Sequence, residues 1–369
     1  MLINLKKNVA VKYILELIFM IGLYAVLDNV GGIKKYVFVL GFCALFLVLG
    51  MKKRWSVETL FCIALPVFTY VILGSLSALI SSTAQGTTAK VILYWLVPLV
   101  FVFSLYINYG EEMSKIVDVQ FLGSFVAYKV FDAPVIFSLT TWESVYAFSF
   151  GAFAIYYAYK RRWKMFILAM IFVYLAEKRI AILAVVFSLL LFGVMWLFRH
   201  SKKLLLTCWG LLSAVIYAYL YWIYSGGMEA FCWAANINTN GRVEIYSRMA
   251  GETVFSLGYL GKGLGIVEQL LEYWNIPMYG NLHNDLLKFY VELGFWGLLI
   301  YLLSLGVMFC LVEKRFGKAQ MSFFFAMSVY SMLLFATDNA SIYMIYLIPM
   351  YTTMFAVLAS DRQIKIEKG

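Results

Sequence analysis

Charged residues, histidines and paired cysteines are scarce in this 369-residue sequence. Only 14% of its residues are charged, against roughly 25% in ordinary soluble domains. At the same time 63% are hydrophobic, and the mean hydropathy is +0.84. This balance excludes disordered and DNA-binding chains, and a soluble fold of this size would lack the polar residues to cover its exterior. The excess apolar surface must face lipid, so the composition predicts an all-α polytopic membrane protein.

The few cysteines and histidines exclude metal-binding and disulfide-rich classes. The five cysteines have no CxxC spacing and mostly lie in apolar runs, so they indicate small hydrophobic residues. His200 lies in a basic cluster beside Arg199, which indicates a surface residue. His283 is the only histidine on the predicted outer side, and one histidine cannot build a zinc site. Neither a metal nor a cofactor is therefore expected.

Apolar runs between basic clusters predict the topology. A spanning helix needs about 17–25 residues, because the hydrocarbon core is about 30 Å thick. Most of the 30 Lys and Arg lie in short clusters between the runs, as expected for cytoplasmic loops rather than for a nucleic-acid-binding surface. The clusters place both termini in the cytoplasm. The runs predict about twelve transmembrane helices, near residues 9–27, 36–50, 57–80, 91–107, 116–140, 142–159, 164–176, 180–198, 204–223, 294–312, 320–337 and 342–359.

Two parts of this topology differ from the others. The run 116–140 contains Asp118, Lys129 and Asp132, so we expect a kinked or cavity-lining span in which Lys129 and Asp132 pair across one turn. The connection over residues 224–293 is far longer than the others and lies on the outer face. Loops beyond about 12–15 residues are usually functional or disordered. We therefore expect one membrane domain over 1–369 whose chemistry lies in this extracytoplasmic loop.

The charged triplet Glu177-Lys178-Arg179 separates two apolar segments, of which the first is too short to cross the hydrocarbon core. Ionisable groups at membrane depth are costly, so they indicate function, with Arg179 a better candidate than Lys178. The alternative is a turn at the outer surface in which Glu177 neutralises one cation.

A second candidate is Arg242, in the first turn of a predicted helix with Asn240 as its N-cap. The helix dipole disfavours a cation there, whereas free amides and a guanidinium together suit a phosphate. A solvated loop arginine is an equally good interpretation. Arg248 has Glu244 and Glu252 four residues away on either side, so a structural role is predicted for it.

The third candidate is His283, which precedes an amphipathic helix that ends at Gly294. Asp285, Lys288 and Glu292 form the polar stripe of this helix. His283 is either a capping residue or the best proton acceptor near neutral pH on the outer side. Asp338, in an outer turn, either orients a base or a sugar hydroxyl or simply marks the turn.

These motifs, in this order, resemble the O-antigen ligase and O-antigen polymerase superfamily over residues 170–300. Arg179 matches that family's Ser-Arg motif, although Lys178 replaces the usual serine. The other motifs that carry the resemblance are Gly241-Arg242 with Tyr246, the glycine-rich segment Gly258–Gly265, and His283-Asn284-Asp285-Leu286 with Glu292-Leu293-Gly294.

The resemblance implies a metal-independent, inverting glycosyltransferase of the C-type membrane class, acting at the outer face of the bacterial cytoplasmic membrane. Its donor would be a glycan on undecaprenyl pyrophosphate and its acceptor a second glycan, with a chain-length regulator and a flippase as pathway partners. Arg179 and Arg242 would hold the pyrophosphate, and His283 would deprotonate or orient the acceptor hydroxyl. The remaining candidates, all for substrate binding, are Lys178, Tyr246, Asn284, Asp285, Lys288 and Asp338.

Three activities remain open at this point. The sequence shows no feature that binds lipid A core or a protein acceptor, which favours a polymerase of repeat units over a ligase. A flippase for lipid-linked oligosaccharides would also suit twelve spans. Transporters, however, place polar residues near the bilayer midplane and often contain internal repeats, whereas these candidates gather at the outer edge.

Overall fold

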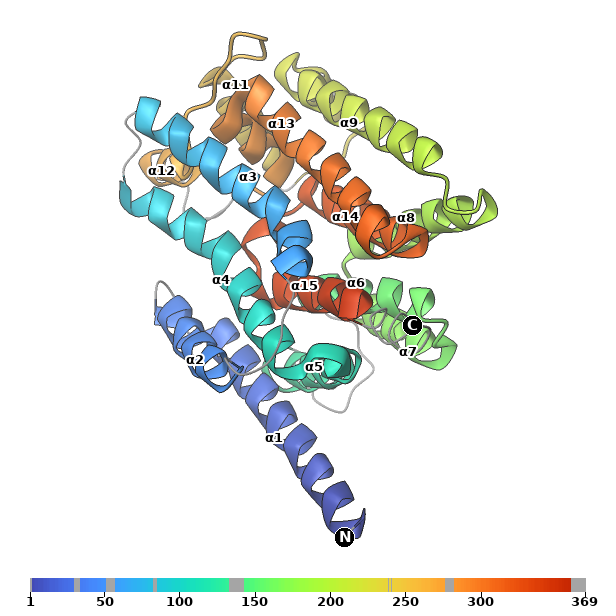
Figure 1. The fold of residues 1–369 in the computed structure, drawn as a ribbon. Coiled ribbons are helices and arrows are strands. Elements are labelled where there is room, and N and C mark those ends of the chain that lie inside the picture. Colours follow the sequence, from blue (N-terminus) through green and yellow to red (C-terminus); the bar gives the residue numbers. More distant parts are fainter. Residues whose placement is uncertain are drawn as a thin grey trace. The chain divides into compact units, whose positions relative to one another are not determined.

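The computed structural model describes residues 2–29, 34–50, 57–81, 85–132, 143–237, 239, 241–275 and 282–359. Within these residues the fold is all-helical, without strands (Figure 1). The α-helices are α1 Leu2–Asn29, α2 Lys34–Gly50, α3 Val57–Ser81, α4 Gln85–Tyr109, α5 Met113–Ala127, α6 Tyr146–Tyr159, α7 Trp163–Leu175, α8 Arg179–Leu197, α9 Lys202–Tyr224, α10 Gly227–Ala234, α11 Arg242–Gly251, α12 Ile266–Tyr273, α13 Asp285–Arg315, α14 Lys318–Phe335 and α15 Met344–Ala359. Short turns are η1 Gly110–Glu112, η2 Tyr128–Asp132 and η3 Ala340–Ile342.

Five helical segments among the described residues are long and apolar enough to cross a membrane: Val57–Ser81, Thr87–Phe131, Arg179–Leu197, Lys202–Tyr224 and Asp285–Arg315. Their outer faces carry large exposed hydrophobic side chains, as lipid-facing helices do. This confirms the predicted all-α membrane class. Within the described residues, each predicted apolar run overlaps a helix, but the count of twelve spans stays a prediction.

The run predicted over 116–140 is described as far as Asp132. There α5 continues into the single π-helical turn η2. Asp118 of α5 accepts two hydrogen bonds from Arg162, at 2.7 and 2.9 Å, and one from the hydroxyl of Tyr157 at 3.0 Å. Its charge is thus neutralised within the protein. The crossing itself and the Lys129–Asp132 pair lie outside what the structure describes.

The chain forms two compact units. The first comprises Met1–Ile63, Leu96–Leu191 and Tyr343–Gly369, and the second comprises Ala64–Trp95 and Phe192–Ile342. In the first unit, α15 is buried along its whole length and packs against α5 and α6, while α6 also packs against α7 (Figure 1). Aromatic rings fill this core, among them Phe121, Phe150, Phe153 and Phe172.

In the second unit, α13 packs against both α14 and α9, as Figure 1 shows. The segment predicted as a long loop, 224–293, contains three short helices in its described part. Helices α10 and α11 pack on α9, and α12 packs on α13. The described part of the segment is therefore folded within this unit.

Helix α13 bends at Gly294, whose backbone is non-helical (φ 74°, ψ −176°), and this confirms the predicted end of the amphipathic helix there. Just before the bend, the carbonyls of Val291 and Glu292 accept hydrogen bonds from outside the helix. The donors are the N–H groups of Lys262 and Gly263, each at 2.9 Å. The glycine-rich segment thus pairs through its backbone with the bend.

Close backbone approach explains two of the glycines in this pairing. Both have left-handed backbone angles, φ 85° at Gly261 and φ 74° at Gly294. A Cβ on Gly261 would lie 2.4 Å from the carbonyl oxygen of Glu292, and one on Gly294 would lie 2.3 Å from the carbonyl carbon of Leu260. Neither position has room for a side chain. This packing fixes the position of α13, and the candidate site residues lie around the start of that helix.

Candidate functional site

His283 lies two residues before α13, with its backbone in the left-handed region (φ 53°). Its N–H donates to Oδ1 of Asn339 at 2.8 Å, and its carbonyl accepts from the hydroxyl of Tyr246 at 2.7 Å. Asn284 follows as the N-cap of α13 and accepts from the N–H of Leu287 at 2.9 Å. A left-handed backbone is uncommon outside glycine, and here it is held from both sides.

The ring of His283 lies beside a buried carboxylate. Its Nδ1 is 3.4 Å from Oδ1 of Asp338, and the side chains are 26% and 3% exposed, respectively. The same carboxylate oxygen accepts from the N–H of Asn339 at 2.8 Å. A carboxylate beside Nδ1 favours the proton on that nitrogen, which leaves Nε2 to accept a proton from another group.

Arg242 opens α11 after Gly241, the N-cap, whose φ is 76°. The prediction of Asn240 as the cap was therefore wrong, because the turn into α11 needs a left-handed residue at position 241; Asn240 itself lies outside the described residues. The partly buried guanidinium of Arg242 donates to the carbonyl of Thr337 at 3.3 Å. The Thr337–Asn339 turn, which follows α14, thus contacts both Arg242 and His283.

Tyr246 lies one helical turn after Arg242 and links α11 to the histidine. Burial raises the pKa of its hydroxyl well above the ordinary value, with the charges of Arg242 and Asp338 acting in opposite directions. The phenol therefore remains a hydrogen-bond donor. The structure brings five predicted site residues together in the second unit: Arg242, Tyr246, His283, Asn284 and Asp338.

Sequence reasoning did not single out two residues of this cluster. Asn339 holds the backbone of His283, and Tyr219 of α9 accepts from the side-chain amide of Asn284 at 2.9 Å. The hydroxyl of Tyr219 in turn donates to the carbonyl of Ala336 at 2.9 Å. The position of Asn339 beside Asp338 in a polar turn could have indicated its role. Tyr219 lies in an apolar run, so nothing in the sequence indicated its role.

The predicted polar stripe of α13 is buried. Nζ of Lys288 forms an ion pair with Oε1 of Glu268 in α12 and lies 4.0 Å from Oε1 of Glu292. The side chains of Lys288 and Glu292 are 4% and 0% exposed. A buried charge needs an oppositely charged partner, and Lys288 is the partner of both Glu268 and Glu292.

The two carboxylates of the stripe hold neighbouring segments. Glu292 accepts from the hydroxyl of Tyr70 in α3 and from the N–H of Gly265 at 2.8 Å. Asp285 is fully buried and accepts from the N–H of Ser341 in η3 at 2.7 Å. These contacts tie α13 to the surrounding elements. Direct contact of Asp285 or Lys288 with a substrate stays a prediction.

The charged triplet lies in the first unit, between α7 and α8. Lys178 forms an ion pair with Glu143 at 2.7 Å and lies over the ring of Phe148. Glu177 has a left-handed backbone (φ 52°), and Arg179 begins α8 with an exposed side chain. The joint action of Arg179 with Arg242 stays a prediction.

Arg248 does not form the predicted ladder of ion pairs. Its guanidinium carbon lies 4.6 Å from the ring centroid of Trp274, close enough for a cation–π contact that ties α11 to the end of α12. This contact agrees with the structural role predicted for Arg248.

A cavity of about 530 Å³ opens beside the start of α11. Gly241 and Val243, which flank Arg242, line it together with Trp233, Glu229 and Glu244. Within the described part of the chain, no group of three or more His, Cys, Asp or Glu side chains is placed to hold a metal ion. The cavity offers hydrogen-bond acceptors and an aromatic face to a polar ligand.

The apolar helices and their buried charges define an integral membrane protein. Residues 164–302 match the model of the O-antigen ligase family, which confirms the resemblance to the O-antigen ligase and polymerase superfamily over this part of the chain. Arg179, Arg242, Tyr246 and His283 lie within the matched segment, and Asp338 lies beyond it. A comparison with curated proteins finds no match.

Proposed function

We propose that the protein is a membrane glycosyltransferase that polymerises oligosaccharide repeat units carried on undecaprenyl pyrophosphate, as in O-antigen, capsule or exopolysaccharide synthesis. One observation carries the proposal: the Thr337–Asn339 turn contacts both Arg242 and the ring of His283. Both residues lie in the O-antigen ligase domain. A cation and a base held together suit the transfer of a sugar from a phosphate leaving group.

In the proposed reaction, the acceptor hydroxyl attacks the anomeric carbon of the donor sugar while the bond from that carbon to the pyrophosphate oxygen breaks. Nε2 of His283 takes the hydroxyl proton, and Asp338 stabilises the resulting imidazolium. Arg242 donates hydrogen bonds to the pyrophosphate, where negative charge develops. The products are the extended glycan and undecaprenyl pyrophosphate.

The state of Arg242 supports this role. Its guanidinium has five N–H donors, and the bond to Thr337 uses only one of its nitrogens. It stands at the start of α11, where backbone amides also favour an anion. The neighbouring cavity supports a sugar there, because Trp233 can stack on a sugar ring and Glu229 and Glu244 can accept from its hydroxyls.

The remaining roles follow from this assignment. We assign Arg179 as the second cation on the pyrophosphate, with Lys178 beside it. Tyr246, Asn284, Asp285 and Lys288 support substrate binding by fixing the segment around His283. The site lies at the outer face of the bacterial cytoplasmic membrane, with both termini in the cytoplasm. A flippase would supply the donor, and a chain-length regulator would act on the polymer.

Ligation is the second candidate, because the matched family is described as O-antigen ligase. A deletion strain distinguishes the two activities. Loss of a polymerase leaves single repeat units on the carrier or at the surface, whereas loss of a ligase leaves long polymer that is not attached to its acceptor. We expect single units, with full-length polymer restored by the wild-type gene.

A transporter would need two compartments to act. Purified protein in detergent, given the host's lipid-linked repeat unit, should instead extend the glycan. The matched control is a variant without the base, which should bind the substrate and leave it unextended. Absence of any extension by the wild-type protein, with transport in vesicles, would contradict the proposed enzyme.

A further inference from the structure

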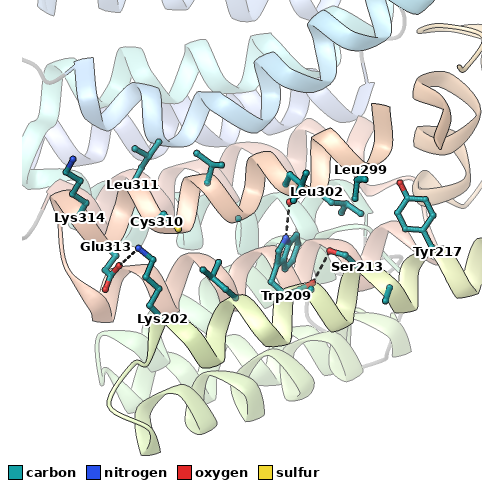
Figure 2. Close-up of a pocket in the computed structure, with 16 residues that line it drawn as sticks. Lys202, Trp209, Ser213, Tyr217, Leu299, Leu302, Cys310, Leu311, Glu313 and Lys314 are labelled. Atoms are coloured by element: carbon teal, nitrogen blue, oxygen red, sulfur yellow. Dashed lines mark hydrogen bonds and ion pairs between the residues drawn. The ribbon is translucent and has the colours of Figure 1, made fainter. Parts of the chain in front are cut away.

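A groove of about 1080 Å³ runs along the second unit between α9 and α13. Figure 2 shows Lys202, Glu313 and Lys314 at one end and Tyr217 and Leu299 at the other. Along α9 these ends are fifteen residues apart, roughly 22 Å at the rise of an α-helix. The groove therefore has the length of a lipid acyl chain.

The walls of the groove suit an apolar chain. Gly210 of α9 and Gly306 of α13 face it without side chains. Its polar wall groups are paired, since Trp209 donates to the carbonyl of Leu302 at 2.9 Å and Ser213 donates to the carbonyl of Trp209 at 2.9 Å. The rest of the lining is mostly aliphatic: Leu206, Ala214, Leu299, Leu303, Val307 and Leu311.

The basic end of the groove decides what kind of lipid fits. Lys202 lies in the first turn of α9, where the helix dipole disfavours a cation and no acidic residue is present. It pairs with Glu313 at 3.1 Å, whereas Lys314 has no carboxylate within ion-pair distance among the described residues. Arg315 and Lys318 follow closely in the chain, so this end is strongly positive. A phosphate there would meet an unpaired cation and a helix N-terminus.

We propose that this groove binds one anionic phospholipid, with its phosphate at Lys314 and Lys202 and an acyl chain between α9 and α13. The polyprenyl tail of a donor would enter from the opposite end and place its apolar terminus at the lysines, which leaves their charge unexplained. The inference is independent of the proposed reaction, because the charged end of the groove, where the phosphate would bind, lies at the opposite end of α9 from Tyr219.

Native mass spectrometry of the delipidated full-length protein tests the proposal, with palmitoyl-oleoyl phosphatidylglycerol and the matching phosphatidylcholine as probes. We expect the anionic lipid to bind about fivefold more tightly, and Lys314→Gln to remove that preference. Lys203→Gln is the matched control, because Lys203 lies beside Lys202 in the first turn of α9 but does not line the groove. It should retain most of the preference.

A second variant fills the groove without changing its charge. A Cβ on Gly210 meets nothing within 4 Å, so a side chain can begin there without a backbone clash, and Gly210→Leu should reduce retention of both lipids about fivefold or more by filling the groove. Gly193→Leu on α8 is the matched control, because its Cβ is equally free. Monodisperse elution in size exclusion confirms folding of each variant.

Three results would overturn the proposal: equal binding of the two lipids, equal effects of Lys314→Gln and Lys203→Gln, or equal effects of the two leucine variants. Binding of undecaprenyl phosphate that is lost in Gly210→Leu and retained in Lys314→Gln would also overturn it, because the groove would then hold a polyprenyl tail.

Discussion

Two groups of charged residues lie at the start of α13, and they differ in how far their charges are already satisfied. The side chains of Arg242 and His283 each meet the Thr337–Asn339 turn through one contact, at 3.3 and 3.4 Å, and the histidine side chain remains partly exposed. Lys288 and Glu292 are buried and share several partners. A charge whose partners are all in the protein stabilises the fold, while one with spare donors can act on a ligand. Arg242 and His283, the reactive group, are therefore the candidates for catalysis. Lys288 and Glu292 stabilise the fold.

Arg242→Ala should give the largest loss of activity. Removing an arginine that stabilises developing charge on a phosphate leaving group costs about 10³-fold in turnover or more. The measurement is the glycan length distribution and turnover at equal expression. Arg248→Ala is the control, because it removes the other arginine of α11. Normal chain lengths in Arg242→Ala would remove this residue from the reactive group.

His283→Asn should cost about 10²–10⁴-fold in turnover, because the proton acceptor is lost. Asparagine tolerates the left-handed backbone better than alanine does, so the variant separates chemistry from strain. His200→Asn is a matched control, since His200 has nearly the same backbone angle (φ 55°) at the turn before α9. Equal activity of the two variants would contradict the assignment of His283.

Lys288→Met should lower the free energy of unfolding by about 3 kcal/mol, because it leaves the carboxylates of Glu268 and Glu292 unpaired in a buried site. Thermal unfolding in detergent measures this. Lys203→Met, at an exposed lysine, should change stability by less than about 0.5 kcal/mol. If Lys288→Met were fully stable yet inactive, Lys288 would belong with Arg242 and His283. The distinction between a catalytic and a structural group of charges would then be wrong.

Tyr246→Phe should reduce kcat about fivefold, because it removes one hydrogen bond, worth about 1 kcal/mol, from the carbonyl of His283. The raised pKa keeps this hydroxyl protonated, so we expect the loss to be constant between about pH 6 and 9. Tyr273→Phe is the control, since Tyr273 is 84% exposed. A loss that varied with pH over this range would point to titration of the phenol itself.

Arg248→Lys should have the smallest effect, with activity within about twofold of wild type, because lysine keeps a cation over the ring of Trp274. Turnover and thermal stability of the purified variant measure it. A loss comparable to that of Arg242→Ala would place Arg248 in the reactive group.

Apolar runs predicted the positions of the helices, because a helix needs apolar side chains whether it faces lipid or the protein core. Residues 180–198 and 204–223, for example, differ by only one or two residues from α8 and α9. The number of crossings does not follow from hydropathy alone, since a short helix such as Trp163–Leu175 can be apolar without spanning 30 Å.

The site was predictable in part. His283, Arg242 and Asp338 stood out because polar residues between apolar runs are few. Their separation from the buried stripe was not predictable, because the partner of Lys288 is Glu268 in a different short helix, and the partner of Glu292 is Tyr70 in a distant apolar run. Helical periodicity shows which residues share a face, and only tertiary packing decides whether that face meets water.

The bend at Gly294 leaves carbonyl groups of α13 free to bind the backbone of another segment. An unbroken helix uses its own carbonyls internally, whereas this one presents two of them to the backbone of Lys262 and Gly263. Main-chain attachment of this kind is indifferent to the side chains along the attached segment. Relatives should therefore diverge at Leu260, whose side chain is 64% exposed, while the register of the segment, and the placement of the histidine beyond it, is preserved.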